Sequence, residues 1–220
     1  KIIPEFSKIM DLPQFDRYHS LTVGQHTLRA LNILKDLKNK KLTNNTYKFV
    51  YKILKKNEDL KPLYYSTLLH DIGKGSGDDH SKVGSRISSK VLKRLNEDNS
   101  TISETRWLIE NHLLMSELAF KRDLGDFSII KKAAKKIKSM ERLTNLFLLT
   151  ALDISAVDQG LWNDWKARLL KTLYEKLEKE INRPSDVVSL NEKISLIKKD
   201  IIQNSKIICS TLVENVSKVT

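Results

Sequence analysis

The chain has 220 residues, a mass of 25.4 kDa, 40% hydrophobic and 30% charged residues, a balance that predicts one soluble globular domain with room for a helical appendage. The single cysteine, Cys209, excludes a disulfide framework and the Cys-rich zinc modules. No apolar run approaches the roughly 18 residues of a membrane span. Because the first residue is Lys1 and no apolar leader follows it, we expect a piece of a longer, cytoplasmic protein.

The chain is basic, with a net charge of +12 from 39 Lys and Arg against 27 Asp and Glu. Such a balance can indicate nucleic acid, an anionic membrane or an acidic protein as partner. Of the basic residues, 30 are Lys and 9 are Arg, whereas specific phosphate and base contacts favour Arg. No recognition-helix or RNA-binding signature accompanies the charge. We therefore expect neither a nucleic-acid nor a membrane partner.

Apolar residues recur at intervals of three and four along most of the chain, which predicts an all-α protein. Residues 1–21 are expected to form an irregular arm anchored by Phe15 and Tyr18. The capping box Thr22-x-x-Gln25 predicts a helix that continues to about residue 37. Two more helices are expected after it, at residues 46–56 and 60–72.

A glycine-rich loop, residues 73–79, divides this half of the chain from the next. Thr101-x-x-Glu104 predicts a helix start, residues 116–127 are expected to form a loop, and Asp126 is expected to cap the helix that follows. The expected helices after the glycine-rich loop cover residues 80–95, 101–115, 126–139, 142–157, 161–181 and 189–216. The predicted organisation is an arm at 1–21, a helical domain at 22–181 and a C-terminal helical extension at 182–220.

Four of the five histidines fall on or beside the inward faces of the predicted helices, together with two carboxylates. Each of them alone would be interpreted as a core residue with a local hydrogen bond. Together they need a common partner, because burying one unpaired polar group costs about 1–3 kcal/mol. A divalent metal ion is such a partner, since imidazole and carboxylate are suitable ligands for zinc, iron or manganese. The set consists of His26, His70, Asp71, His80, His112 and Asp153.

The pattern His26…His70-Asp71…Asp153 resembles the H…HD…D signature of the HD superfamily of metal-dependent phosphohydrolases. His80 and His112 stand where superfamily members with two metals have their additional ligands. The resemblance implies an all-α HD-domain helical bundle. It also implies one metal ion held by the four signature residues and a second held by Asp71, His80 and His112.

A closer resemblance covers most of residues 4–180 and is to the HD domain of the bifunctional uridylyltransferase/uridylyl-removing enzymes of bacterial nitrogen signalling. In that family the HD domain hydrolyses UMP from a tyrosine of the PII regulatory protein with manganese or magnesium. The family also joins the HD domain to nucleotidyltransferase and ACT domains, which these 220 residues do not include. The blocks that carry the resemblance are Gln14–His19, Thr22–Thr27, His70–Gly75, Gly77–Ser81, Asn111–Ser116 and Gly160–Lys166.

The resemblance implies a uridylyl-removing phosphodiesterase with one or two divalent ions, manganese or magnesium first and iron or zinc as alternatives. Asp71 and Lys74 are the expected catalytic residues, with Lys74 stabilising charge on the phosphoryl oxygens. Lys74 and Arg122 are the expected substrate contacts. Gly24 departs from the family, because an acidic residue is expected at that position.

Two other functions stay open. The HD metal core alone does not fix the substrate, so a phosphohydrolase of small nucleotides is the first alternative. A catalytically silent regulatory module is the second. Among the other conspicuous residues, Trp162 and Trp165 are expected to pack in the core, and the basic stripe of Lys131, Lys135 and Lys138 to face solvent.

Overall fold

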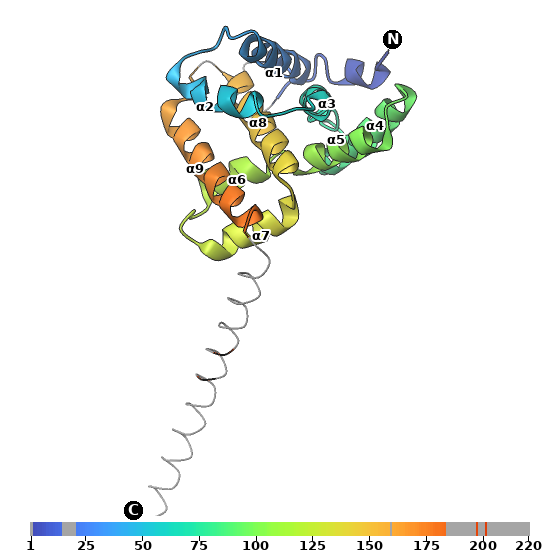
Figure 1. Ribbon diagram of the computed structural model, residues 1–220. Coiled ribbons are helices and arrows are strands. Elements are labelled where there is room, and N and C mark those ends of the chain that lie inside the picture. Colours follow the sequence, from blue (N-terminus) through green and yellow to red (C-terminus); the bar gives the residue numbers. More distant parts are fainter. Residues whose placement is uncertain (1, 15–20, 159, 184–196, 198–200, 202–220) are drawn as a thin grey trace, which may run out of the picture. The chain divides into compact units, whose positions relative to one another are not determined.

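The computed structural model describes residues 2–14, 21–158 and 160–183, together with Ile197 and Ile201. Every regular element in this part of the chain is helical (Figure 1), which confirms the all-α prediction. None of the described helices is both long and apolar enough to cross a bilayer. Phe15, Tyr18 and, apart from Ile197 and Ile201, the predicted helix at 189–216 lie outside the described residues. The elements are the 3-10 helix η1 (Pro4–Lys8), α1 (Val23–Lys38), α2 (Asn45–Leu54), α3 (Lys61–Leu69), α4 (His80–Arg94), α5 (Asn99–Asn111), α6 (Leu114–Lys121), α7 (Phe127–Ile137), α8 (Met140–Val157) and α9 (Asp164–Ile181).

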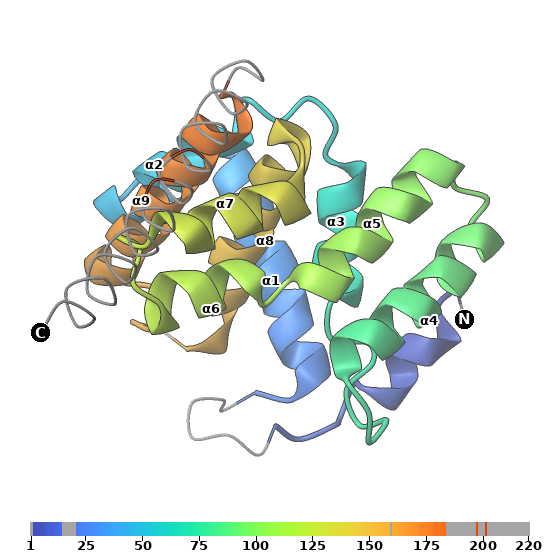
Figure 2. The ribbon, with the colours of Figure 1, turned by 90° about the horizontal axis from the view of Figure 1, so that it is seen from below.

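Helix α8 is the centre of the fold. Nearly every residue from Leu143 to Val157 is buried, Asp153 is the one charged residue among them, and such a helix is stable only when other elements cover it. Helices α1, α2, α3, α5, α6 and α9 all pack against it. In the view of Figure 2, α4 and α5 lie side by side at one edge of the fold, and α2 and α9 lie at the other.

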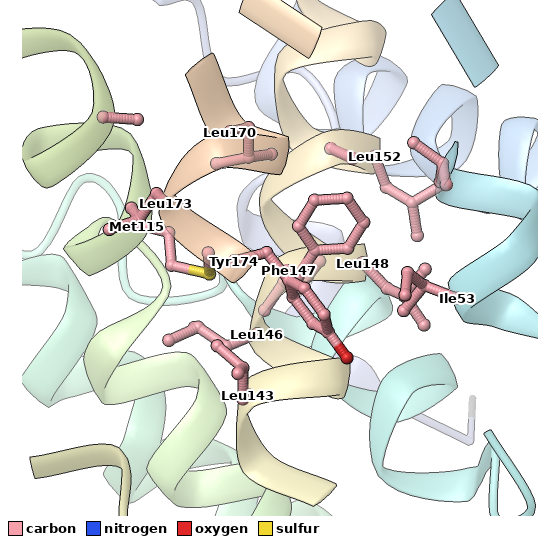
Figure 3. Close-up of a cluster of buried hydrophobic side chains, with 14 of the residues drawn as sticks. Ile53, Met115, Leu143, Leu146, Phe147, Leu148, Leu152, Leu170, Leu173 and Tyr174 are labelled. Atoms are coloured by element: carbon pink, nitrogen blue, oxygen red, sulfur yellow. The ribbon is translucent and has the colours of Figure 1, made fainter. Parts of the chain in front are cut away.

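An aromatic cluster fixes α2 and α9 to α8. The Phe147 ring of α8 lies 5.4 Å from the Phe49 ring of α2 and 5.1 Å from the Tyr174 ring of α9, measured between centroids. Figure 3 shows Phe147 and Tyr174 surrounded by leucines of α8 and α9. Because edge-on aromatic pairs of this size bury large apolar areas, this cluster anchors one end of the bundle.

The helix caps show where local sequence decided the fold. The capping box at α1 is confirmed, because Gln25 N donates to Thr22 Oγ1 at 3.2 Å and Thr22 N donates to Gln25 Oε1 at 3.1 Å. Asp126 caps α7 as expected. The expected cap of the fifth helix is wrong. Helix α5 begins at Asn99 with Asp98 as its cap, and Thr101 is the residue whose backbone N–H donates to Asp98.

Two predicted boundaries near the histidines are also wrong. Residues 114–121 form α6 and not a loop, because the chain turns at His112 and then buries Met115 and Ala119 one helical turn apart. Helix α3 ends at Leu69. The chain continues from there in tight turns with i to i+3 hydrogen bonds, Ile72 N to Leu69 O at 3.1 Å and Lys74 N to Asp71 O at 2.9 Å.

The N-terminal arm packs on the bundle. The backbone N–H groups of Val23 and Gly24, which have no partner inside α1, donate to Leu12 O at 2.9 Å and Ile9 O at 3.0 Å. A Cβ atom on Gly24 would lie 2.6 Å from Met10 Cα. The glycine that departs from the family pattern is thus the residue that lets the arm cross α1. The arm belongs to the same compact unit as the helices, residues 1–181, and residues 182–220 form a second unit.

Candidate metal centre

Six polar side chains converge from five helices at the centre of the fold. His26 lies on α1, His70 and Asp71 directly follow α3, His80 begins α4, His112 follows α5, and Asp153 lies in the last turns of α8. Four of them are at most 2% exposed, namely His26, His70, Asp71 and His112. The side chains of His80 and Asp153 are 29% and 22% exposed. The cluster is therefore buried on one side and open to solvent on the other.

A close backbone approach brings α4 to the cluster. A Cβ atom on Gly73 would lie 2.2 Å from His80 O and 2.6 Å from Gly84 N, so any larger residue would push α4 away from the turn. Asp79 caps the helix by accepting from Ser81 N at 3.1 Å. The result is that His80 Nε2 lies 3.9 Å from Asp71 Oδ1.

The six side chains form two donor groups that share Asp71. In each group, one ligand atom per residue lies within 4.8 Å of the others; the groups are His26, His70 and Asp71, and Asp71, His80 and His112. Asp153 adjoins the first group, with its Oδ1 atom 2.9 Å from His26 Nε2 and 3.6 Å from His70 Nε2.

Backbone carbonyls orient two of the imidazoles. His70 Nδ1 donates to Thr67 O at 3.0 Å, and His112 Nδ1 donates to Ile109 O at 2.7 Å. A histidine that ligates a metal is oriented in this way, with the proton on the far nitrogen. In His70, the remaining nitrogen Nε2 is buried and has no hydrogen-bond partner in the described part of the chain. It lies 3.4 Å from Asp71 Oδ2, so a divalent cation that replaced a proton on this nitrogen could be held by both residues.

The charges of the cluster act on one another strongly. Burial alone would lower the pKa of His70, but the carboxylates of Asp71 and Asp153 raise it to about 10. Burial opposes the ionisation of Asp71 and Asp153 as well, yet the charge of His70 beside Asp71 and the hydrogen bonds of His26 and His70 to Asp153 hold both pKa values well below the usual range. Burial lowers the pKa of His112 to about 4, so this imidazole is neutral at pH 7 and able to donate a lone pair.

Lys74 lies beside the cluster on the turn after Asp71. Its Nζ atom is 2.8 Å from Asp71 Oδ2 and donates to Gln14 Oε1 at 2.7 Å. Sequence reasoning included Gln14 in the first block of the family resemblance but gave it no role, because the contact joins residues 60 positions apart and no local periodicity signals it.

The other three residues named from the sequence, Arg122, Trp162 and Trp165, lie in different environments. Arg122 is exposed at the C-terminal end of α6, and its role as a substrate contact stays a prediction. Trp162 is buried and donates to Thr46 O at 3.3 Å, which confirms core packing. For Trp165 the expectation is wrong: it is 56% exposed and stacks on Phe120, because it lies off the stripe of α9 that faces the core.

The basic stripe of α7 lies opposite the buried face of that helix, as expected. A cavity of about 790 Å³ lies between α2 and α9, and none of the six cluster residues lines it. The candidate site is therefore identified by its clustered histidine and aspartate side chains and not by the size of a cavity.

Comparison with known proteins, like the geometry of the cluster, indicates a metal-binding domain. The HD domain family matches residues 18–157, more than half of the chain. The chain is similar to two proteins named bifunctional uridylyltransferase/uridylyl-removing enzyme. The one from Zymomonas mobilis is 42% identical over 175 residues, which are 80% of this chain and 19% of the relative. The one from Caulobacter vibrioides is 38% identical over 178 residues, which are 81% of this chain and 19% of the relative. A relative of the same name in Novosphingobium aromaticivorans is 35% identical over 207 residues, 91% of this chain and 23% of the relative.

The chain thus spans about a fifth of the length of these curated relatives. Both resemblances drawn from the sequence, to the HD superfamily and to the HD domain of the bifunctional enzymes, are confirmed. The gathered imidazoles and carboxylates fit the divalent metal that an HD domain binds. The chain belongs to the HD domain family of metal-dependent phosphohydrolases.

Proposed function

We propose that this chain is a metal-dependent phosphodiesterase that removes UMP from a uridylylated tyrosine of a PII-type signalling protein. The observation that carries the proposal is the pair of donor groups that share the Asp71 carboxylate. The name of the relatives includes a uridylyl-removing activity, which supports the proposed reaction, and the PII tyrosine is what the sequence resemblance implies. Because those relatives are about four times as long as this chain, we also propose that nucleotidyltransferase and ACT domains are joined to this domain in the natural protein.

The proposed ligands divide between two ions. His26, His70, Asp71 and Asp153 hold the first ion, and Asp71, His80 and His112 hold the second. The buried Nε2 atom of His70, which lacks a hydrogen-bond partner in the described part of the chain, and the neutral imidazole of His112 both support this assignment. Four imidazoles and two carboxylates suit manganese well, and they also accommodate iron or zinc, whereas magnesium prefers oxygen ligands. We therefore take manganese as the first metal to test, with magnesium next because the sequence resemblance implies it.

When bound, divalent ions polarise phosphoryl oxygens and lower the pKa of water from 15.7 to about 7. The protein's own contribution beyond its ligands is Lys74, whose ammonium lies next to Asp71 and stabilises negative charge that develops on the phosphoryl oxygens. The tyrosine leaving group has an ordinary pKa of about 10, so it departs as phenolate without a strong general acid. The open side of the cluster, at His80 and Asp153, gives a protein-bound phosphodiester access.

The test is release of UMP from uridylylated PII by the purified chain with added manganese. We expect His70→Ala and Asp71→Asn to lower the rate by more than about a hundredfold, because even the residues behind metal ligands are worth about 10–100-fold. The matched control is Asp126→Asn, since Asp126 is an exposed cap of α7 and asparagine caps helices equally well. The control should retain the parent rate.

Other results would identify other functions. Hydrolysis of free nucleoside monophosphates without UMP release from PII would indicate a phosphohydrolase of small nucleotides. Manganese binding without turnover of either substrate would indicate a silent regulatory module. Metal-independent release, or release that survives in both variants, would contradict the proposal.

A further inference from the structure

The N-terminal arm reaches the candidate metal centre through Gln14. We propose that Gln14 is a positioning residue for Lys74, which keeps the Lys74 ammonium at the open side of the cluster when metal ions engage Asp71. This inference rests on the proposed function, in which Lys74 stabilises charge on the phosphoryl group. It adds to the site a residue that lies outside the histidine and aspartate pattern.

Separate contacts fix the course of the arm before it reaches Lys74. Glu5 forms a two-pronged ion pair with Arg94 of α4, with N–O distances of 3.0 and 2.7 Å. Ile9 is 1% exposed and accepts a hydrogen bond from Gly24 N at 3.0 Å. A Cβ atom on Gly75 would lie 3.0 Å from a methyl group of Leu12, so the arm lies directly on the glycine-rich loop. These contacts hold the arm in a defined position, so the contact between Gln14 and Lys74 is part of the packed structure and not a chance surface contact.

Lys74 has two partners, an ion pair with Asp71 and a hydrogen bond to Gln14, and bound metal ions would compete for the first of them. Its Nζ atom lies 2.8 Å from Asp71 Oδ2 and 2.7 Å from Gln14 Oε1. Asp71 is the carboxylate common to both donor groups, so bound cations would occupy its oxygens and repel the ammonium. Gln14 is then the acceptor that continues to hold Lys74, and the other two ammonium hydrogens stay available for phosphoryl oxygens.

A neutral acceptor suits this task. An amide oxygen orients the ammonium and leaves its full positive charge for the substrate, whereas a carboxylate would neutralise it. Holding the amide there costs stability, because Gln14 Nε2 is a buried donor that has lost its water and has no hydrogen-bond partner among the described residues. A residue selected only for packing would avoid this cost, because an apolar side chain of the same size carries no buried donor.

The experiment is a double-mutant cycle between Gln14 and Lys74. We expect Gln14→Ala to lower kcat for UMP release about tenfold, equivalent to about 1.4 kcal/mol of transition-state stabilisation, and to change KM less than twofold. In the Lys74→Ala background the same change should alter kcat less than twofold, because its effect acts through Lys74. Gln14→Glu should lower kcat as well, although it keeps an acceptor. The control is Asp11→Ala, an exposed position of the same arm.

A structural role would give a different result. If Gln14→Ala acted by loosening the arm, Glu5→Gln would have a similar effect on kcat, and the losses from Gln14→Ala and Lys74→Ala would be additive. Either outcome would overturn the proposal, as would parent-level activity in Gln14→Glu.

A second readout separates this inference from the proposed function. Calorimetric titration of UMP in the presence of manganese needs no turnover. If the parent chain releases no UMP from PII, the proposed function fails, and the binding cycle still decides the inference. A loss of UMP affinity of about threefold or more in Gln14→Ala that disappears in the Lys74→Ala background supports it. Equal UMP affinity in all four proteins, or no binding at all, overturns it.

Discussion

Replacement of Asp71 by asparagine is the most severe single test of the candidate centre, because its carboxylate belongs to both donor groups. The measurement is the shift in melting temperature when manganese is added, compared within each variant so that changes to the metal-free fold cancel. His112→Ala removes a donor from the second group alone. The sharing of Asp71 therefore predicts three different shifts, one each for the parent, His112→Ala and Asp71→Asn.

The size of each shift follows from mass action. A site filled at 100 times its Kd stabilises the folded state by about 2.7 kcal/mol, and 1 kcal/mol raises the melting temperature of a domain of this size by about 2–4 °C. One occupied site thus gives about 5–11 °C and two give about twice that. We expect the full shift in the parent, about half in His112→Ala and little in Asp71→Asn.

The assay is thermal unfolding followed by circular dichroism, with and without manganese, and with a chelator to return each protein to its metal-free curve. Asp126→Asn, which changes an exposed carboxylate that belongs to neither donor group, should keep the full shift. The reasoning is refuted if Asp71→Asn is stabilised as much as the parent, because the metal would then bind elsewhere.

Three other predictions concern the fold. Gly24→Ala should lower the free energy of unfolding in urea by about 1–3 kcal/mol, as overpacking does, since the new Cβ would lie 2.6 Å from Met10 Cα; a gain, as expected for an ordinary helical glycine, would contradict the docking of the arm. Phe147→Ala should cost about 3–5 kcal/mol in the same assay, and a loss below about 1 kcal/mol would show that the aromatic cluster is not tightly packed. Tyr65 donates to Glu97 and so holds the pKa of Glu97 below its ordinary value of 4.5. Because the pKa of Glu97 is lower in the folded state than in the unfolded state, its ionised form stabilises the folded protein above pH 4.5. This stability is lost as the pH falls through the lowered pKa. Glu97→Gln should therefore be less stable than the parent at pH 7 and converge with it in acid; an equal difference at both pH values would count against the bond from Tyr65 to the Glu97 carboxylate.

The sequence by itself determined the helical class, most helix starts and the six residues of the candidate centre. These features are local. A capping box such as Thr22-x-x-Gln25 satisfies N–H groups within one turn, and apolar periodicity marks the inward face of each helix whatever it packs against. The six polar residues on those faces stood out because a buried polar side chain needs a partner, and His70 Nε2 indeed has no hydrogen-bond partner within the described residues.

Only the tertiary structure decided what depends on contacts between distant segments. The end of α3 before His70 and the start of α6 after His112 depend on how those turns pack, and the exposure of Trp165 depends on which face of α9 meets the core. The docking of the arm and the bond from Lys74 to Gln14 join positions 60 residues apart. Local propensity cannot specify such pairs, because their free energy arises only after the bundle around α8 has brought the two segments together.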